Sequence, residues 1–257
     1  MAIAANNPNK AAASPITIDK VKFPTKFIAV VSLVVLAILG TYRWYLHNYS
    51  FSVGLDYFEP IFQTYWMSLF YTQLVVVALV TSGSLVTLWL TRKNLQDLSP
   101  AEELQRYFYV FGLMAVVAGL FVLGLQTYAE ADAAWHQVTI RDTDFTPTHI
   151  ILFYFVAPAL VGFLINAALW MHTRLPDFAN RVSIPLLLVV MGPMLIMPNL
   201  GFNEWGHTFF YAEELFAAPI HYGFVVLGWG FFGLTGVLAQ CLHRVMVLTS
   251  MMKAKTH

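Results

Sequence analysis

Six long apolar stretches constrain this chain more than any other feature of its sequence. Each approaches or exceeds the roughly 20 apolar residues that a helix needs to cross the hydrocarbon core of a bilayer. The first stretch carries one charged residue, Arg43, near its end, and the other five carry no Asp, Glu, Lys or Arg. The stretches are residues 27–46, 66–90, 107–128, 149–171, 183–200 and 219–242.

The composition agrees with a membrane protein. Apolar and aromatic residues make up 58% of the 257 residues, and charged residues only 11%, against about 25% in a typical globular protein. This balance excludes a disordered protein, a nucleic-acid binder with basic patches and an ordinary soluble enzyme. The single cysteine, Cys241, excludes an intrachain disulfide and a four-cysteine metal site. We therefore predict an all-α fold, a polytopic membrane helix bundle with six transmembrane helices.

The basic residues predict how this bundle is oriented. Cytoplasmic loops of membrane proteins are rich in Lys and Arg, and with six spans 12 of the 14 basic residues fall on one side. Both termini are therefore predicted to be cytoplasmic. The opposite side has only two, Arg43 and Arg141. The twelve are Lys10, Lys20, Lys22, Lys26, Arg92, Lys93, Arg106, Arg174, Arg181, Arg244, Lys253 and Lys255.

Three segments follow from this topology. We expect residues 1–26 to be a mobile cytoplasmic tail, residues 27–245 to be the helix bundle, and residues 246–257 to be a cytoplasmic C-terminal tail. No small-residue cleavage site follows the first apolar stretch, so it is predicted to be a retained span. Most tryptophans stand near predicted span ends, which is typical of membrane-interface anchors: Trp44, Trp66, Trp89, Trp135, Trp170 and Trp205.

Two outer loops repeat one pattern of polar residues. In the first loop, Asp132 is followed four residues later by His136, and His149 opens the next span. The second loop has Asn203, His207 and His221 at nearly the same spacing. A proline stands two residues before each span-opening histidine, as suits the first turn of a helix; these are Pro147 and Pro219.

The spacing favours a metal site. Residues four apart share one helix face, so Asp132 and His136 can bind one ion, and His149 completes a set of two imidazoles and a carboxylate. Such a set leaves coordination positions open, and imidazole suits copper, iron or zinc. The alternative is that these histidines pack at the membrane interface and Asp132 pairs with Arg141. The second set is weaker, because the neutral amide of Asn203 is a poor ligand.

At these loops the chain resembles the C subunit of the copper membrane monooxygenases, the family of particulate methane monooxygenase and ammonia monooxygenase. The similarity extends from about residue 43 to residue 230. It rests on ordered runs, which are DAAWHQ (132–137), RDTDFTPTH (141–149), PNLGFNEWGH (198–207), EELF (213–216) and APIHYGF (218–224).

The resemblance implies a function. The family inserts one atom of O₂ into a small, unactivated substrate, and it joins three different subunits, named A, B and C, in a trimer of heterotrimers within a bacterial inner or intracytoplasmic membrane. It implies a copper cofactor, a quinol reductant and copper held by Asp132, His136 and His149, which we take as the catalytic residues. A second copper site is implied at Asn203, His207 and His221. No partnership with nucleic acid is expected.

Departures from the familiar methane and ammonia sequences leave the substrate open. The family pattern leads us to expect acids at the positions of Ile61 and Gln63, and a glutamine at that of Ala131. Phe210 and Ala212 replace residues that are bulkier in the family pattern. Smaller neighbours would enlarge a substrate pocket, so the expected substrates are methane, ammonia or a short-chain hydrocarbon. Two other classes remain as alternatives: a proton- or metal-coupled transporter, and a structural membrane subunit whose histidines bind partner chains.

Overall fold

The computed structural model describes residues 21–121, 145–192 and 231–254, together with positions 124, 127, 128, 131, 132, 134, 135 and 229. Every regular element within these residues is helical. Helix α1 (Thr25–Val53) is a single unbroken helix. The second long helix comprises α2 (Pro60–Phe62), the π-helical turn η2 (Gln63–Met67) and α3 (Ser68–Leu90).

Two further composite helices follow among the described residues. Helix α4 (Pro100–Val116) continues into the π-helical turn η3 (Val117–Phe121), and positions 124 to 135, where described, are helical too. Helix α6 (Pro147–Ile151), the turn η4 (Leu152–Val156) and α7 (Ala157–Arg174) are continuous. The short α8 (Pro176–Ala179), helical residues 184–192 and α11 (Thr235–Ala254) follow.

Four helices in the described part of the chain are long and apolar enough to cross a membrane: Thr25–Val53, Pro60–Leu90, Pro147–Arg174 and Phe231–Ser250. They coincide with or overlap four of the six stretches predicted from sequence. The third predicted span begins inside α4, and the fifth is helical over residues 184–192, while its remaining residues lie outside the described part. The chain is therefore a membrane protein that is all-helical over the residues that the structure describes.

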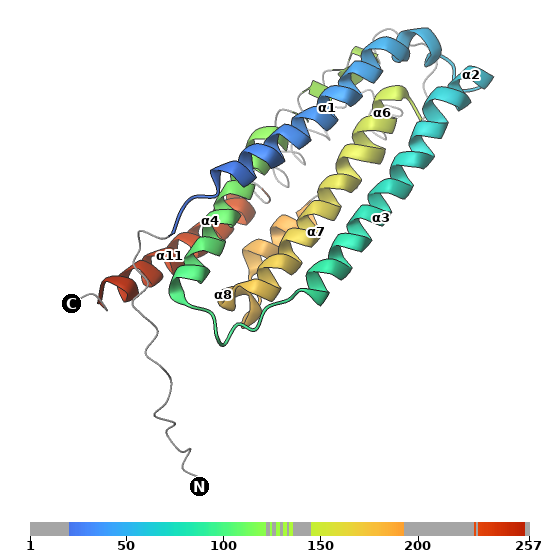
Figure 1. Cartoon of the computed structure of the whole chain (residues 1–257). Coiled ribbons are helices and arrows are strands. Elements are labelled where there is room, and N and C mark those ends of the chain that lie inside the picture. Colours follow the sequence, from blue (N-terminus) through green and yellow to red (C-terminus); the bar gives the residue numbers. More distant parts are fainter. Residues whose placement is uncertain are drawn as a thin grey trace.

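The helices form an elongated bundle with two different ends (Figure 1). At one end lie the last turn of α3, the first turn of α4, α8 and the last turns of α11. At the opposite end lie α2, the last turn of α1 and the start of α6. We call the first end the basic end, because it carries Arg92, Arg106, Arg174, Arg181 and Arg244.

Arginine side chains bind the helices together at the basic end. Arg174 donates hydrogen bonds to the backbone oxygens of Leu88 and Thr91, at 3.4 and 3.2 Å, so it satisfies carbonyls at the end of α3. Arg106 on α4 donates to the backbone oxygen of Arg174. Arg244 on α11 forms an ion pair with the buried Glu103 on α4. These contacts fix the relative positions of α3, α4, α7 and α11.

The described residues form two apolar cores along the length of the bundle. One joins α4, α7, α8 and α11 through residues such as Leu104, Leu164, Phe178 and Cys241. The other lies at the opposite end and joins α1, η2 and α6 around Trp66. Within this second core, Gln73 donates to the backbone oxygen of Ile150 at 2.6 Å and accepts from the Tyr42 hydroxyl. Gln73 therefore connects neighbouring helices, as polar residues inside membrane spans commonly do.

Two long helices keep broad apolar faces outside both cores. The side chains of Leu33 on α1 and Leu79 on α3 are 67% and 68% exposed. An isolated soluble domain does not present continuous apolar faces of this kind. The faces therefore suit contact with lipid or with other membrane subunits. They include Val30, Leu33, Val34, Val75, Val76, Leu79 and Val80.

Candidate functional site

The candidate site begins at the start of α6, where a helix cap positions two polar side chains. Thr146 is the N-cap residue, and its Oγ1 accepts a hydrogen bond from the backbone N–H of His149 at 3.1 Å. Pro147 occupies the first helical position, where its missing N–H costs nothing and its fixed φ favours the helix. Thr148 and His149 follow in the first turn and are buried.

Asp132 meets this turn from the helical positions that follow η3. Its Oδ1 lies 3.3 Å from Nε2 of His149. The same carboxylate oxygen accepts a short hydrogen bond from the Thr148 hydroxyl. The side chains of His149 and Asp132 are only 9% and 18% exposed. The fold therefore places a carboxylate and an imidazole from distant positions in one mostly enclosed space.

Two threonines extend this contact into a chain of hydrogen bonds. The hydroxyls of Thr146 and Thr148 lie 3.1 Å apart and are both buried. Thr146 thus joins the backbone of His149 to Thr148, and Thr148 joins this chain to Asp132. The helix cap and the carboxylate are parts of one network, so the position of Asp132 is linked to that of His149.

The predicted ligands are placed only in part. Asp132 and His149 of the first predicted set are brought together, while His136 lies outside the described residues. The whole second set, Asn203, His207 and His221, also lies outside them. So does Arg141, the alternative partner of Asp132. Within the described residues, no group of three His, Cys, Asp or Glu side chains is arranged to hold a metal ion.

The geometry of the described pair fits two ligands of one ion. Ligand atoms about 2.0–2.1 Å from a metal, at tetrahedral angles, lie about 3.3–3.4 Å apart. The 3.3 Å between His149 Nε2 and Asp132 Oδ1 is in this range. Thr148 holds the carboxylate from outside the pair, as partners of metal ligands commonly do. The donor types, imidazole and carboxylate oxygen, suit a first-row transition metal.

Aromatic rings cover this region of the bundle. The ring of Phe153 lies 4.9 Å from the imidazole of His149, measured between centroids. Phe145 stacks with Tyr57 and with Tyr154, and both centroid separations are 5.7 Å. These rings extend the apolar core around Trp66 up to the polar pair. Among the described residues, aromatic rings therefore stand beside His149, and both side chains of the pair are mostly shielded from solvent.

Close backbone packing holds α6 in place. A Cβ added to Gly54, just after α1, would lie 2.5 Å from the Ser50 oxygen, 2.7 Å from Pro147 Cγ and 2.9 Å from Trp66 Nε1. Only a glycine lets the end of α1 approach Pro147 and Trp66 this closely. On the other side of α6, Gln73 binds the backbone oxygen of Ile150.

Thr146, Thr148 and Gly54 were not predicted from the sequence to be parts of the site. A signal for the threonines was present, because Thr-Pro-Thr-His places an N-cap residue, an N1 proline and a ligand in one helical turn. His172 lies near the basic end, where its Nδ1 is 3.1 Å from the backbone oxygen of Phe178.

The comparison with protein families gives a clear match. The profile of the AmoC family, the C subunit of ammonia monooxygenase and methane monooxygenase, matches residues 9–252, nearly the whole chain. The chain belongs to this family. The family assignment agrees with the resemblance stated from the sequence and with the apolar helices of the fold. A family of this kind provides one component of a monooxygenase, so membership implies association with other monooxygenase subunits. The comparison with curated proteins found no match.

Proposed function

We propose that this AmoC-family protein supplies a copper site to a membrane-bound monooxygenase that uses O₂ and a reductant to hydroxylate a small substrate. Asp132, His136 and His149 are the proposed ligands. The observation that carries the proposal is the 3.3 Å approach of His149 Nε2 to Asp132 Oδ1, in a chain of this family. Family membership favours this function over the transporter and the purely structural role.

Each described residue has a defined part in the proposed site. A bound copper ion supplies the redox chemistry with O₂. The His149 imidazole offers a neutral nitrogen ligand, and the Asp132 carboxylate offers an anionic oxygen that offsets cationic charge. Thr148 keeps that carboxylate turned toward His149. The surrounding aromatic rings keep water away from the reacting groups and leave an apolar approach for the substrate.

The proposed topology puts this site near the outer face of the membrane. Six spans with both termini cytoplasmic assign the basic end of the bundle to the cytoplasm, as the positive-inside rule requires. Residues 1–26 and 246–257 are then cytoplasmic tails, and residues 27–245 form the bundle. His149 belongs to α6, which starts at the end of the bundle opposite the basic end (Figure 1), and Asp132 contacts it. An apolar substrate and O₂ would reach the site from the bilayer, where both are concentrated.

The wider assignment also belongs to the proposal. We propose association with the A and B subunits of the monooxygenase as a trimer of heterotrimers in a bacterial inner or intracytoplasmic membrane, with a quinol as reductant. Methane, ammonia and short-chain hydrocarbons are the proposed substrate candidates. Asn203, His207 and His221 are proposed as a second copper site.

The test uses the intact complex in native-like lipid, with copper content and substrate oxidation measured on the same sample. His149→Ala should lose copper from the first site and oxidation together. His172→Ala is the matched control, because this histidine lies on the same continuous helix but near the basic end. It should retain both properties. Oxidation at the wild-type rate by the His149 variant would refute the assigned role, and ion flux without O₂ consumption would support the transporter instead.

A further inference from the structure

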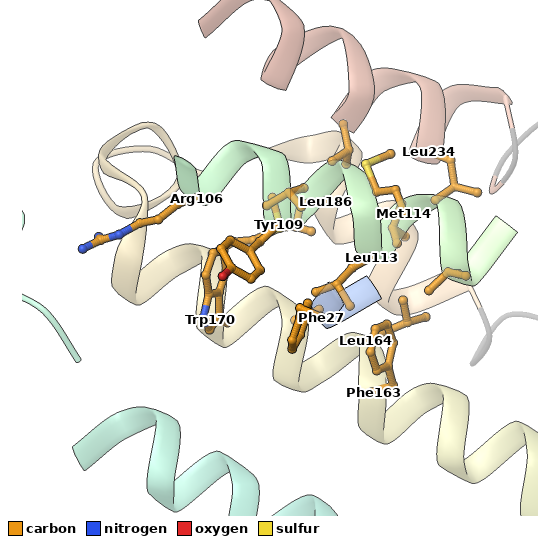
Figure 2. A pocket seen from close by; sticks show the side chains of 16 residues that line it. Phe27, Arg106, Tyr109, Leu113, Met114, Phe163, Leu164, Trp170, Leu186 and Leu234 are labelled. Carbon is orange, nitrogen blue, oxygen red and sulfur yellow. The ribbon is translucent and has the colours of Figure 1, made fainter. Parts of the chain in front are cut away.

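A cavity of about 410 Å³ lies inside the bundle, lined by residues other than Asp132 and His149. It is partly open and is lined by α4, α7, α11 and helical residues 184–192, with Phe27 of α1 on one side. Its walls are apolar along most of its length, with Leu113, Met114, Phe163 and Leu234 among the lining residues (Figure 2). The volume is within the range of small-molecule binding pockets, about 300–1,000 Å³.

The polar groups of this cavity are gathered toward one end. Figure 2 shows Arg106 at that end, with Tyr109 and Trp170 beside it, while the other labelled side chains line the rest of the cavity. All three are half-buried. Arg, Tyr and Trp side chains at the end of an apolar cavity are typical of the membrane–water interface, where each keeps its polar group near headgroups. The cavity therefore suits an amphiphile, because it has an apolar body and a polar end.

Arg106 has donors available for a ligand. Among the described residues it forms one hydrogen bond, to the backbone oxygen of Arg174, and no ion pair. A guanidinium has five N–H donors. The two acids of α4, Glu102 and Glu103, attract the Arg106 charge without an ion-pair contact, because their hydrogen bonds go to other partners. Glu103 binds Arg244 through both oxygens, and Glu102 accepts from Ser99. Within the described chain, the positive charge at the cavity entrance is thus in ion-pair contact with no carboxylate.

More positive charge stands next to this entrance. The segment before α1 is fixed to α4, because the Gln105 side chain exchanges hydrogen bonds with the backbone N–H and oxygen of Lys22 at 3.0 and 2.7 Å. Phe27 packs against Tyr109, with ring centroids 5.1 Å apart. Lys22 and Lys26 therefore stand on the segment that borders the entrance. Basic pockets between membrane helices on the cytoplasmic side favour anionic lipid headgroups.

We propose that this cavity binds an anionic phospholipid, with one acyl chain between α4, α7 and α11 and the phosphate held by Arg106. A neutral amphiphile such as a quinol would fill the apolar part but would leave the Arg106 charge unpaired. The proposal does not depend on the copper site, because none of the residues that line the cavity belongs to that site. It assigns the basic end of the bundle a lipid-binding role in addition to its proposed role in topology.

The test measures lipid retained by the intact purified complex. The complex is exchanged into detergent micelles doped with equal amounts of phosphatidylglycerol, phosphatidylcholine and a short-chain ubiquinol, and bound species are counted by native mass spectrometry. We expect selective retention of phosphatidylglycerol. Arg106→Gln should weaken phosphatidylglycerol retention about fivefold, because one cation near a lipid headgroup contributes about 1 kcal/mol. Arg92→Gln removes an exposed cation of the same end and should leave retention unchanged.

A second pair of variants tests the acyl-chain part of the cavity. Ala167 lines it and the adjacent Ala168 does not. Ala167→Leu should reduce phosphatidylglycerol retention, and Ala168→Leu should not. Equal retention of phosphatidylglycerol and phosphatidylcholine, preferential retention of ubiquinol, or insensitivity to both Arg106→Gln and Ala167→Leu would each overturn the proposal.

Discussion

Arg244 on α11 binds Glu103 on α4 with two parallel hydrogen bonds. Its Nε donates to Oε1 at 2.8 Å and its Nη2 donates to Oε2 at 2.9 Å. The Glu103 side chain is 5% exposed, whereas that of Arg244 is 26% exposed. A buried carboxylate needs a close cation, because its transfer out of water costs several kcal/mol. This pair therefore joins the last helix of the chain to α4.

Breaking this ion pair from one side should destabilise the protein strongly. Arg244→Met leaves the Glu103 carboxylate buried without a partner, at a cost of about 3–5 kcal/mol. The double variant Glu103→Leu/Arg244→Met removes both charges and should recover most of that loss. Thermal unfolding of the purified complex measures the difference. Equal losses in the single and double variants would show that the buried charge is not the cause.

Gly54 supports the candidate site through close packing. In Gly54→Ala the new Cβ would overlap the Ser50 oxygen, Pro147 and Trp66. We expect a lower unfolding temperature and lower copper content, because Pro147 begins the turn that carries His149. Gly40→Ala is the control on α1, since a Cβ there meets nothing within 4 Å. A Gly54→Ala complex with wild-type copper content and stability would contradict this account of the packing.

Thr148 is predicted to act through Asp132. Thr148→Val keeps the shape of the side chain but removes the hydrogen bond to the carboxylate. Loss of such a partner typically lowers metal affinity about 10–100-fold. Competition with a chelator measures copper affinity in the intact complex. Thr148→Ser, which retains the hydroxyl, should stay close to wild type. If the Val variant binds copper as tightly as the Ser variant, Thr148 has no positioning role.

The start of α4 should respond to acid. Hydrogen bonds from the Ser99 side chain and backbone lower the pKa of Glu102 in this capping box. Because the folded pKa is below the unfolded one, the stabilisation is present above the ordinary Glu pKa of about 4.3. It is lost as the pH falls through the folded value.

Ser99→Ala tests this capping box. It should cost about 1 kcal/mol and remove that part of the pH dependence, while Ser99→Thr should retain both. Thermal unfolding at about pH 7 and about pH 4 distinguishes these outcomes. An unchanged acid response in Ser99→Ala would contradict the assignment.

The lengths of the apolar stretches predicted much of the fold. A segment that crosses the bilayer must satisfy its own backbone hydrogen bonds, and a long helix does so. Four of the six predicted spans correspond to long apolar helices in the described residues. The tryptophans were predicted less well. Trp44 and Trp89 are 58% and 52% exposed, as expected for interface anchors, but Trp66 and Trp135 are 0% and 2% exposed. Position along a span does not say which way a side chain faces, and these two rings pack inside the bundle.

Within the candidate site, the sequence predicted the proposed ligands but not the residues that support them. The spacing of Asp132 and His149 nominated both residues, and the fold brings them together. The contributions of Thr148 and Gly54 depend on which helices meet at the start of α6, and that packing is not encoded in any local spacing. The pair Glu103 and Arg244 is 141 residues apart in sequence and was missed for the same reason.

We propose that Asp132 and His149 bind one copper ion. Anomalous diffraction at the copper absorption edge, from crystals of the intact complex, tests it most directly. We predict an anomalous peak about 2 Å from both His149 Nε2 and Asp132 Oδ1, which disappears in His149→Ala and persists in His172→Ala. A fully copper-loaded, active complex with no peak between these two atoms would contradict the account.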